Sequence, residues 1–414
     1  MLASIFPLAH TRYSSLPILG GIWEGLCSWL SRQGYPIAAI RRRVRAGPQL
    51  EEALCGRDVR FLGDLTASQL RSLAPLPTHW NAQITGSLVR SLTEYLEEQG
   101  ALASPPITPT VEQTAAYRKY MERVRGLAPS TAVREVRRVC EFLQFLDYDA
   151  HPERLRELKV ADVDGFIAQA GRRFGRASMQ KVTATLRSFL RFLAAEGRGP
   201  SSLDAQINSP RCFRGERLPR ALPWETIRSL LRSTDRSTPK GRRDYAMFLL
   251  IATYGLRVSE IAALKLDDVS WRSQQIRVPR PKVGTPLLLP LTDEVATALL
   301  DYLRHGRAAS AHRHLFLRVR IPAGPIKSTA VCDAFDVWAR RAGIQLPKGA
   351  AGPHCLRHSL AMHLLRQRTS VKTIGDLLGH RSVESTCVYL RLQVEDLRDV
   401  ALPLPRAAAG EVQP

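Results

Sequence analysis

Six polar residues in the second half of the chain have side chains that together could break a phosphodiester bond without a metal ion. They are Arg257, Lys282, His354, Arg357, His380 and Tyr389. Paired guanidinium groups can hold the non-bridging oxygens of a five-coordinate phosphorus, where negative charge develops. A tyrosine hydroxyl, with a pKa of about 10, attacks phosphorus only when a nearby base or cation activates it. A lysine can protonate the departing oxygen, and histidines can carry protons near the phosphate.

Each of these residues also has an ordinary structural explanation when it is taken alone. An arginine such as Arg257 is commonly a surface charge. His354 and Arg357 are three residues apart and share a helix face, but this spacing is frequent in proteins. His380 follows a glycine at a predicted helix end, where an imidazole can satisfy free carbonyl groups. Tyr389 would commonly be a core aromatic. The functional hypothesis therefore depends on the whole set.

The charge of the chain favours a polyanionic partner. The sequence has 60 Lys and Arg against 38 Asp and Glu, a formal net charge of +22. Residues 1–107 carry 10 basic and 8 acidic residues, residues 108–208 carry 17 and 12, and residues 209–414 carry 33 and 18. Arginine-rich coding could by itself produce such an excess. Its concentration in the last part, a net +15, nevertheless points there for an electrostatic footprint.

Cysteine usage and hydropathy indicate a cytoplasmic protein. The 7 cysteines are spread without a C-x-x-C pair in a chain too long to need disulfide crosslinks, so we expect reduced thiols. The longest apolar stretches, such as residues 246–252, fall well short of the roughly 20 residues that span a membrane. Residues 1–21 lack a basic residue before their short apolar run, and we expect no secretory signal.

Composition and periodicity divide the 414 residues into three domains. Residues 1–107 form a helical N-terminal extension of unknown role, with helices predicted at 22–30, 36–44, 66–73 and 84–99. A proline-rich linker at 102–109 precedes a four-helix domain, residues 108–208, with helices predicted at 111–125, 129–146, 161–169 and 178–195. Residues 209–223 form a basic, proline-rich linker that suits a phosphate backbone, although a solvated linker has the same composition.

The last domain, residues 224–405, mixes helical and β patterns. Two short β-rich runs, 275–279 and 286–291, flank Val283, Gly284 and Thr285 and predict a hairpin. The fold class is therefore mainly α with a small β-hairpin or sheet (α+β). Helices are predicted at 224–231, 243–253, 258–264, 293–304, 329–342, 354–368, 371–378 and 383–392.

The motifs of this domain resemble those of the tyrosine recombinases, also called phage-type integrases. The matching stretches are GLRVSEIAALKLDDV at 255–269, the hairpin lysine before LLLPL, HCLRHSLAMHLL at 354–365 and LLGHRSVESTCVYL at 377–390. The resemblance covers roughly residues 108–400. An H-x-x-R motif, then L-L-G-H, then a tyrosine nine residues after that histidine is a specific order and spacing.

The resemblance implies a role for each of the six residues. Arg257 and Arg357 would bind phosphate, Lys282 would be the general acid, His354 the base, His380 the second histidine and Tyr389 the nucleophile. Glu260 would support the first arginine. Residues 108–208 would be the SAM-like core-binding domain.

The resemblance also implies the reaction and the assembly. The expected function is site-specific recombination of double-stranded DNA through a 3′-phosphotyrosyl intermediate, serving a mobile element, plasmid or phage, with no cofactor and no metal. The working assembly would be a homo-tetramer, or one with related recombinases, on paired sites. A helix at 390–404 would dock on a neighbouring protomer.

The sequence departs from the family pattern in the hairpin and at the N-terminus. The family hairpin often carries several basic residues after its lysine, whereas this chain has Lys282 alone, with Arg280 as the substitute. Residues 1–107 exceed what the simplest members require. Their near-neutral charge favours protein contacts or a helical extension of the DNA clamp over a basic arm.

Three other readings compete with a recombinase. His354, Cys355, His358 and His363 lie within ten residues and could bind zinc, although core histidines are commoner on such a helix. A non-catalytic DNA-binding accessory protein could retain the fold, but a relic should have lost some of the six positions. A type IB topoisomerase shares the chemistry but has a different motif arrangement. The DNA target cannot be read from the sequence, because base readout needs placed side chains.

Overall fold

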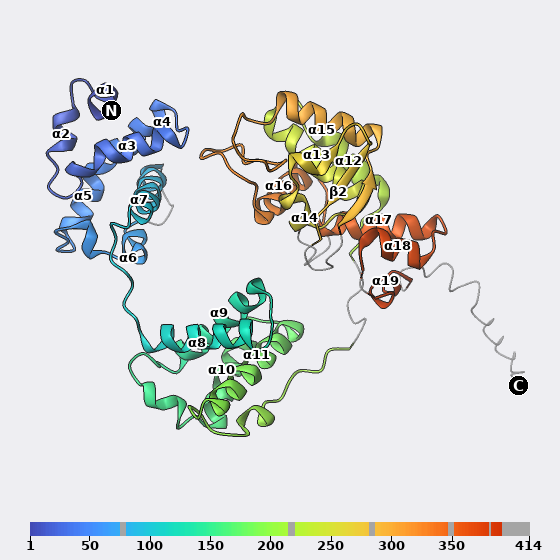
Figure 1. Ribbon diagram of the computed structural model, residues 1–414, viewed down its shortest axis with the longest axis horizontal. Helices are drawn as coiled ribbons and strands as arrows, with labels where there is room; N and C mark the ends of the chain where they lie inside the picture. The colour runs from blue at the N-terminus through green and yellow to red at the C-terminus, as the bar shows by residue number, and fades with distance from the viewer. Residues whose placement is uncertain (75–79, 214–219, 281–285, 347–351, 381, 391–414) are drawn as a thin grey trace, which may run out of the picture. The chain divides into compact units, whose positions relative to one another are not determined.

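α13 (Pro239–Tyr254) is buried along most of its length and forms the centre of the last domain. Its apolar run from Ala246 to Ala252 contacts helices on several sides, as expected for a helix that is hydrophobic all round. Five other helices of this domain pack against it, at residues 224–233, 258–263, 293–305, 328–341 and 354–366. The computed structural model describes residues 1–74, 80–213, 220–280, 286–346, 352–380 and 382–390 (Figure 1).

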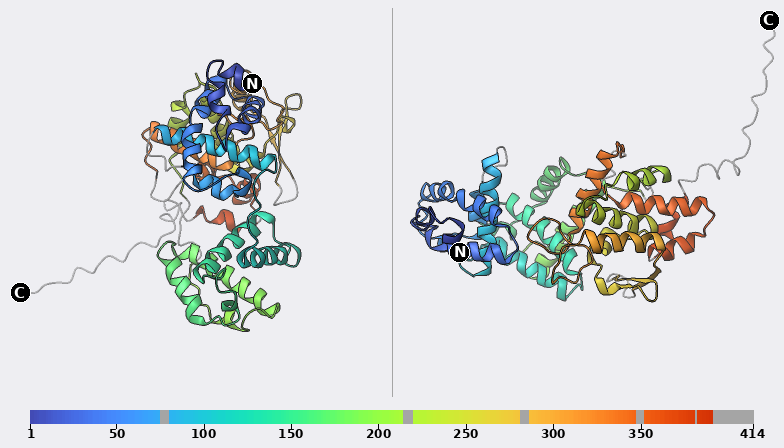
Figure 2. Two further views of the ribbon diagram at one scale, coloured as in Figure 1. Left: turned by 90° about the vertical axis from the view of Figure 1, so that its left-hand side faces the viewer. Right: turned by 90° about the horizontal axis from the view of Figure 1, so that it is seen from above.

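The last domain is helical with one small sheet. Its helices are α12 (Trp224–Ser233), α13, α14 (Val258–Ala263), α15 (Asp293–His305), α16 (Ser328–Arg341), α17 (His354–Arg366), α18 (Val371–Leu378) and α19 (Glu384–Cys387). The antiparallel sheet has the order β1 (Val269–Ser270), β2 (Gln275–Val278), β3 (Leu287–Pro290). β2 and β3 form the predicted hairpin, with Ile276 opposite Leu289. Figure 2 shows the sheet at one edge of these helices.

Two hydrophobic cores hold this domain. The larger one surrounds α13 and includes Phe248, Phe316 and Phe335. The smaller one packs α17 against α18 and the segment after α19; its buried members are Ala361, Met362, Leu365, Ile374, Leu378 and Tyr389. Tyr389 is therefore fixed by apolar packing as part of a core.

The middle of the chain forms a helical body with its own core. Its helices are α8 (Pro109–Arg123), α9 (Pro129–Phe145), α10 (Val160–Gly171) and α11 (Arg176–Ala195), with 3₁₀ turns at Pro152–Leu155 and Leu203–Gln206. Prolines open α8 and α9, where a missing N–H costs nothing. Tyr117, Phe142 and Phe189 are fully buried at its centre. The four predicted helices are thus confirmed, with ends shifted by a few residues.

The N-terminal part is also helical. It contains α1 (Leu2–Ile5), α2 (His10–Ser14), α3 (Trp23–Arg32), α4 (Ile37–Arg45), α5 (Gly47–Cys55), α6 (Ala67–Ser72) and α7 (Trp80–Glu98), with 3₁₀ turns at Gly20–Ile22 and Leu62–Asp64. The sequence pattern did not predict α5, because it begins with Gly47 and a proline. Gly47 is needed there, since a Cβ would lie 2.4 Å from the Trp23 ring. The carboxylate of Glu51 accepts hydrogen bonds from the N–H groups of Ile18 and Leu19.

Contacts within the chain define two compact units. One comprises Met1–Arg60, Leu73–Tyr95 and Arg217–Pro414, and the other comprises Phe61–Ser72 and Leu96–Glu216. The helix predicted at 383–392 is shorter in the structure, where α19 spans Glu384–Cys387 and begins after Val383. All seven cysteines lie within the described ranges and are free thiols. None of the helices in those ranges combines the length and apolar character needed to cross a membrane.

A buried polar network on α13 is joined to α16 by a hydrogen bond from Trp338. Asp244 is fully buried and accepts hydrogen bonds from Arg243 at 2.7 and 3.0 Å and from the Trp338 indole N–H at 2.9 Å. Arg243 also donates to the Leu317 carbonyl. Every charge in this network has a partner, so removal of one member leaves an uncompensated buried charge.

We predict that Asp244→Asn lowers the free energy of unfolding by about 3–5 kcal/mol, because it leaves the Arg243 guanidinium buried without its counter-charge. Asp301→Asn is the matched control, since it breaks the more exposed ion pair with Arg242 and should cost about 0–1 kcal/mol. Urea denaturation of the full chain, followed by circular dichroism, measures both. Equal losses in the two variants would contradict the structural role given to Asp244.

Candidate active site

Arg257 is positioned by the turn between α13 and α14. Gly255 ends α13 in the left-handed conformation, with φ +64°, and Arg257 is the N-cap residue of α14. The Glu260 carboxylate accepts hydrogen bonds from the Arg257 backbone N–H and from its guanidinium, both at 2.8 Å. The guanidinium also donates to the Gly379 carbonyl at 3.2 Å. The Arg257 side chain remains 36% exposed, so its other N–H groups can meet a ligand.

Arg357 lies behind this exposed arginine, on α17. Its side chain is 2% exposed and donates to the carbonyls of Gly255 and Leu378. Burial, and then repulsion from Arg257, lowers the pKa of Arg357 to about 10. A group with that pKa still carries its positive charge at pH 7. The two predicted phosphate-binding arginines therefore meet at one place, the end of α18.

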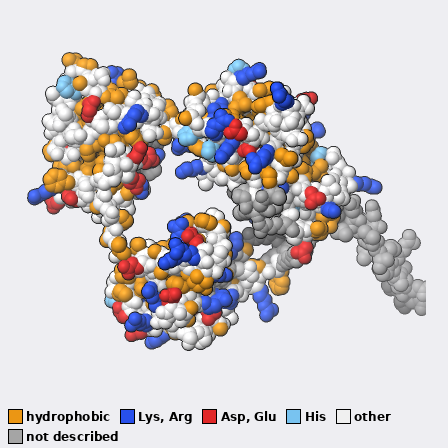
Figure 3. Space-filling model, in the orientation of Figure 1, with side chains coloured by type: hydrophobic (Ala, Val, Ile, Leu, Met, Phe, Trp, Pro, Cys, Tyr) orange, Lys and Arg blue, Asp and Glu red, His pale blue; other side chains and the backbone are white. Residues whose placement is uncertain are grey.

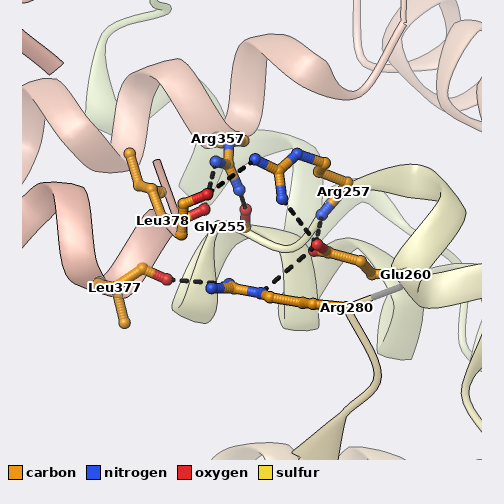
Figure 4. Close-up of polar contacts among 8 residues, drawn as sticks. Gly255, Arg257, Glu260, Arg280, Arg357, Leu377 and Leu378 are labelled. Atoms are coloured by element: carbon orange, nitrogen blue, oxygen red, sulfur yellow. Dashed lines mark hydrogen bonds and ion pairs between the residues drawn. The ribbon is translucent and has the colours of Figure 1, made fainter. Parts of the chain in front are cut away.

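A third arginine, Arg280, joins them from the end of β2. Its guanidinium is 3.5 Å from Glu260 and donates to the Leu377 carbonyl at 3.1 Å (Figure 4). Burial lowers its pKa, and the charge of Glu260 opposes that shift. Gly379 has φ +62°, a conformation in which other residues are strained, and a Cβ there would displace the Arg280 guanidinium, which lies 1.9 Å from that position.

Three guanidinium groups thus contact three successive carbonyls, those of Leu377, Leu378 and Gly379. The free carbonyls at a helix C-terminus carry partial negative charge and favour cations. Sequence reasoning considered Arg280 only as a substitute for Lys282. No sequence signal distinguished it, because neither its burial nor its partners can be read from spacing.

Tyr389 comes to the same site from the segment after α19. It is 2% exposed, and its hydroxyl lies 2.9 Å from His358 Nδ1. Burial raises the pKa of Tyr389, and the nearby Arg357 acts in the opposite direction. From the sequence, His358 was predicted only as a zinc ligand or a core histidine. Its contact with the tyrosine hydroxyl was not predicted, because the sequence around Arg357 does not show which distant segment packs against α17.

The two predicted histidines flank this pair. The His354 ring packs edge-on against His358 with 4.5 Å between centroids, and burial and the charges of Arg357 and Arg257 lower the pKa of His354. His380 Nδ1 is 2.8 Å from the Thr386 hydroxyl, and its ring is parallel to that of Tyr389. Burial, followed by repulsion from Arg357 and Arg257, lowers the pKa of His380 to about 4. The site therefore combines fixed cationic charge with neutral imidazoles at pH 7.

Five of the six predicted residues are thereby brought together. The sixth, Lys282, lies outside the described residues, as does the tail helix predicted at 390–404 beyond residue 390. The zinc reading finds no support in the described ranges, where no group of three or more His, Cys, Asp or Glu side chains could hold a metal. His363 instead stacks on Trp224 at 4.3 Å.

Comparison with known proteins agrees with this geometry. The model of the phage integrase family matches residues 220–396, and that of the phage integrase N-terminal SAM-like domain matches residues 115–197. A Sinorhizobium fredii protein named as an integrase/recombinase, y4rA, is 36% identical over 78% of this chain and 79% of its own length. The tyrosine recombinase XerD of Listeria monocytogenes is 30% identical over 67% of this chain and 92% of its own length.

The fold is also found in solved structures. A lambda integrase tetramer bound to a Holliday junction superposes with a TM-score of 0.51 at 17% identity, over 73% of this chain and 86% of that one. The match in architecture, the two domain models and the extent of the sequence similarity agree with the converging arginines and tyrosine. The chain belongs to the tyrosine recombinase family and is a site-specific recombinase.

Proposed function

We propose that the chain cuts and rejoins double-stranded DNA through a covalent bond between Tyr389 and a 3′-phosphate. The observation that carries this proposal is the meeting of Arg257, Arg357 and Tyr389 at one site. Fixed guanidinium charge favours the extra negative charge of a five-coordinate phosphorus, and the tyrosine supplies the nucleophile. Arg257, the more exposed of the two, would meet a non-bridging oxygen directly, with Arg357 adding charge from behind.

The proposed reaction conserves bonds at each step. The Tyr389 oxygen attacks phosphorus as the bond from phosphorus to the 5′ oxygen breaks. Lys282 gives a proton to that oxygen, so that a 5′-hydroxyl leaves. The hydroxyl of a partner strand then attacks the phosphotyrosine and releases Tyr389. One phosphoester bond replaces another, and the reaction needs neither ATP nor a metal ion.

His354 and His380 would act beside the phosphate. The family resemblance assigns His354 the role of base, and its ring lies against His358, which contacts the Tyr389 hydroxyl. His380 is held by Thr386 and lies parallel to the Tyr389 ring. We assign His380 to hydrogen bonding of the phosphate, since Nδ1 already has a partner and Nε2 can face a ligand.

Two domains and the linker between them would bind the DNA. Residues 108–208 would be the core-binding domain and residues 224–405 the catalytic domain, linked by the basic residues 209–223. In the view of Figure 3, Lys and Arg side chains are spread over the lobe of α8–α11 and over the lobe of α12–α17. Neutralising many phosphates makes binding strongly salt-dependent. Residues 1–107 would serve protein contacts or extend the clamp.

The proposed assembly is a homo-tetramer on paired DNA sites. Exchange between two duplexes breaks four strands, and each break needs one nucleophile. The similarly folded lambda integrase is seen as a tetramer on a Holliday junction, and the 390–404 segment would supply the contact between protomers. We propose a cytoplasmic protein that serves a mobile element, plasmid or phage.

We predict that Tyr389→Phe abolishes the covalent adduct with a DNA duplex nicked near the cleavage point, because phenylalanine has no nucleophilic oxygen. The nick lets the short cleaved fragment diffuse away and traps the adduct of the wild-type protein. Denaturing gel electrophoresis separates the adduct from free protein. Undiminished adduct in Tyr389→Phe would refute the nucleophile assignment. Adduct in neither protein, with DNA binding intact, would favour the non-catalytic accessory protein.

We predict that Lys282→Met slows cleavage about 10²- to 10⁴-fold on ordinary DNA, the contribution typical of a general acid. The same variant should cleave DNA with a 5′-bridging sulfur at nearly the wild-type rate, because a thiolate leaves without a proton. Single-turnover rates on the two substrates test this.

Arg280→Met is the matched control. Its cleavage rate should fall equally on both substrates, since Arg280 contacts Glu260 and α18. If the sulfur substrate restored the rate of Arg280→Met and did not restore that of Lys282→Met, the general acid would be Arg280.

A further inference from the structure

The Tyr389 hydroxyl is held beside one imidazole because both side chains are fixed by their surroundings. Tyr389 is a member of the small core of α17 and α18, and its oxygen lies 2.9 Å from His358 Nδ1. His358 is half-buried on α17, four residues after His354 and adjacent to Arg357. Because the core fixes the ring and the helix fixes the imidazole, the contact joins the reacting atom to a potential base.

The surroundings of His358 keep its imidazole neutral. Burial lowers its pKa to about 4, with smaller contributions from electrostatic repulsion by His354, Arg357, His380 and Arg220. Among the residues that the structure describes, these and Tyr389 are the titratable and charged groups that act on the His358 imidazole. A neutral imidazole has one N–H and one acceptor nitrogen. When Nε2 carries the hydrogen, Nδ1 accepts a hydrogen bond from the tyrosine hydroxyl.

We propose that His358 is the catalytic residue that accepts the proton of Tyr389 as this oxygen attacks phosphorus. The inference rests on the proposed function and differs from it in the identity of the base. The His354 ring instead contacts the His358 ring, with 4.5 Å between centroids.

The proton balance is complete in both directions. As the bond from Tyr389 to phosphorus forms, its proton moves to Nδ1 and His358 becomes an imidazolium ion. When a 5′-hydroxyl later displaces Tyr389, its proton passes to the Lys282 amine, which gave up a proton in the first step, and the imidazolium returns the tyrosine proton to the leaving phenolate. A phosphate beside Arg357 offsets the positive field around His358, so the substrate itself favours protonation of the base at the moment of attack.

The test is single-turnover cleavage of the nicked duplex by the full chain carrying His358→Asn. We expect a rate about 10²- to 10⁴-fold below wild type near pH 7, the range typical of a lost general base. Without the base, the rate should rise about tenfold per pH unit between about pH 7 and 9, as the fraction of ionised tyrosine grows. The wild-type rate should change little over that range.

An acidic tyrosine analogue separates a lost base from a damaged site. Trifluorotyrosine at position 389 ionises at lower pH than tyrosine, and it should therefore restore most of the rate of His358→Asn while changing wild type little. His358→Gln keeps a hydrogen-bond acceptor without basicity and should behave in the same way. His363→Asn is the control on the same helix, since His363 stacks on Trp224, and it should cleave as wild type does.

Two outcomes would overturn the assignment. If His358→Asn or His358→Gln cleaved DNA at the wild-type rate or faster, the hydrogen bond between His358 and Tyr389 would have no part in catalysis. The base would be His354 if the cleavage rate of His354→Asn rose with pH and was restored by trifluorotyrosine, while the His358 variants showed neither effect. Failure of the proposed function is distinguishable from both, because the wild-type protein would then form no adduct at all.

Discussion

The site depends on one electrostatic constraint, the convergence of three guanidinium groups on the end of α18. The three positive charges repel one another, and burial of Arg280 and Arg357 adds a desolvation cost. The Glu260 carboxylate and the carbonyls of Leu377, Leu378 and Gly379 offset both. Because these carbonyls end a helix, they carry partial negative charge toward the arginines. The site proposed to bind phosphate thus also fixes α14, α17, α18 and the segment after β2 to one another.

Two glycines make this convergence sterically possible. Gly255 and Gly379 both adopt positive φ at helix ends, where other residues are strained. A Cβ at Gly255 would lie 2.5 Å from Leu378, and one at Gly379 would lie 1.9 Å from Arg280. The two glycines therefore let α13 and α18 end in the left-handed conformation beside the guanidiniums.

The same positive field determines the protonation of the histidines. His354, His358 and His380 all have pKa values lowered by burial and by the neighbouring arginines. Neutral imidazoles can accept protons and hydrogen bonds, whereas the guanidiniums retain their charge. In the proposed reaction, separate groups would therefore stabilise charge and transfer protons. A negatively charged substrate would weaken the field that keeps the imidazoles neutral, which links substrate binding to basicity.

The sequence by itself predicted the helices of the middle and last domains, the β2–β3 hairpin, the family and five side chains that the structure brings together, because periodicity and motif spacing are local properties. Only the tertiary structure revealed that Arg280 is buried against Glu260 and that His358 contacts Tyr389. Those contacts join residues 20 and 31 positions apart in the sequence. They arise because Arg280 reaches Glu260 and the end of α18, and because Tyr389 packs in one core with residues of α17 and α18. Spacing cannot encode such contacts, since they depend on which distant surfaces bury one another.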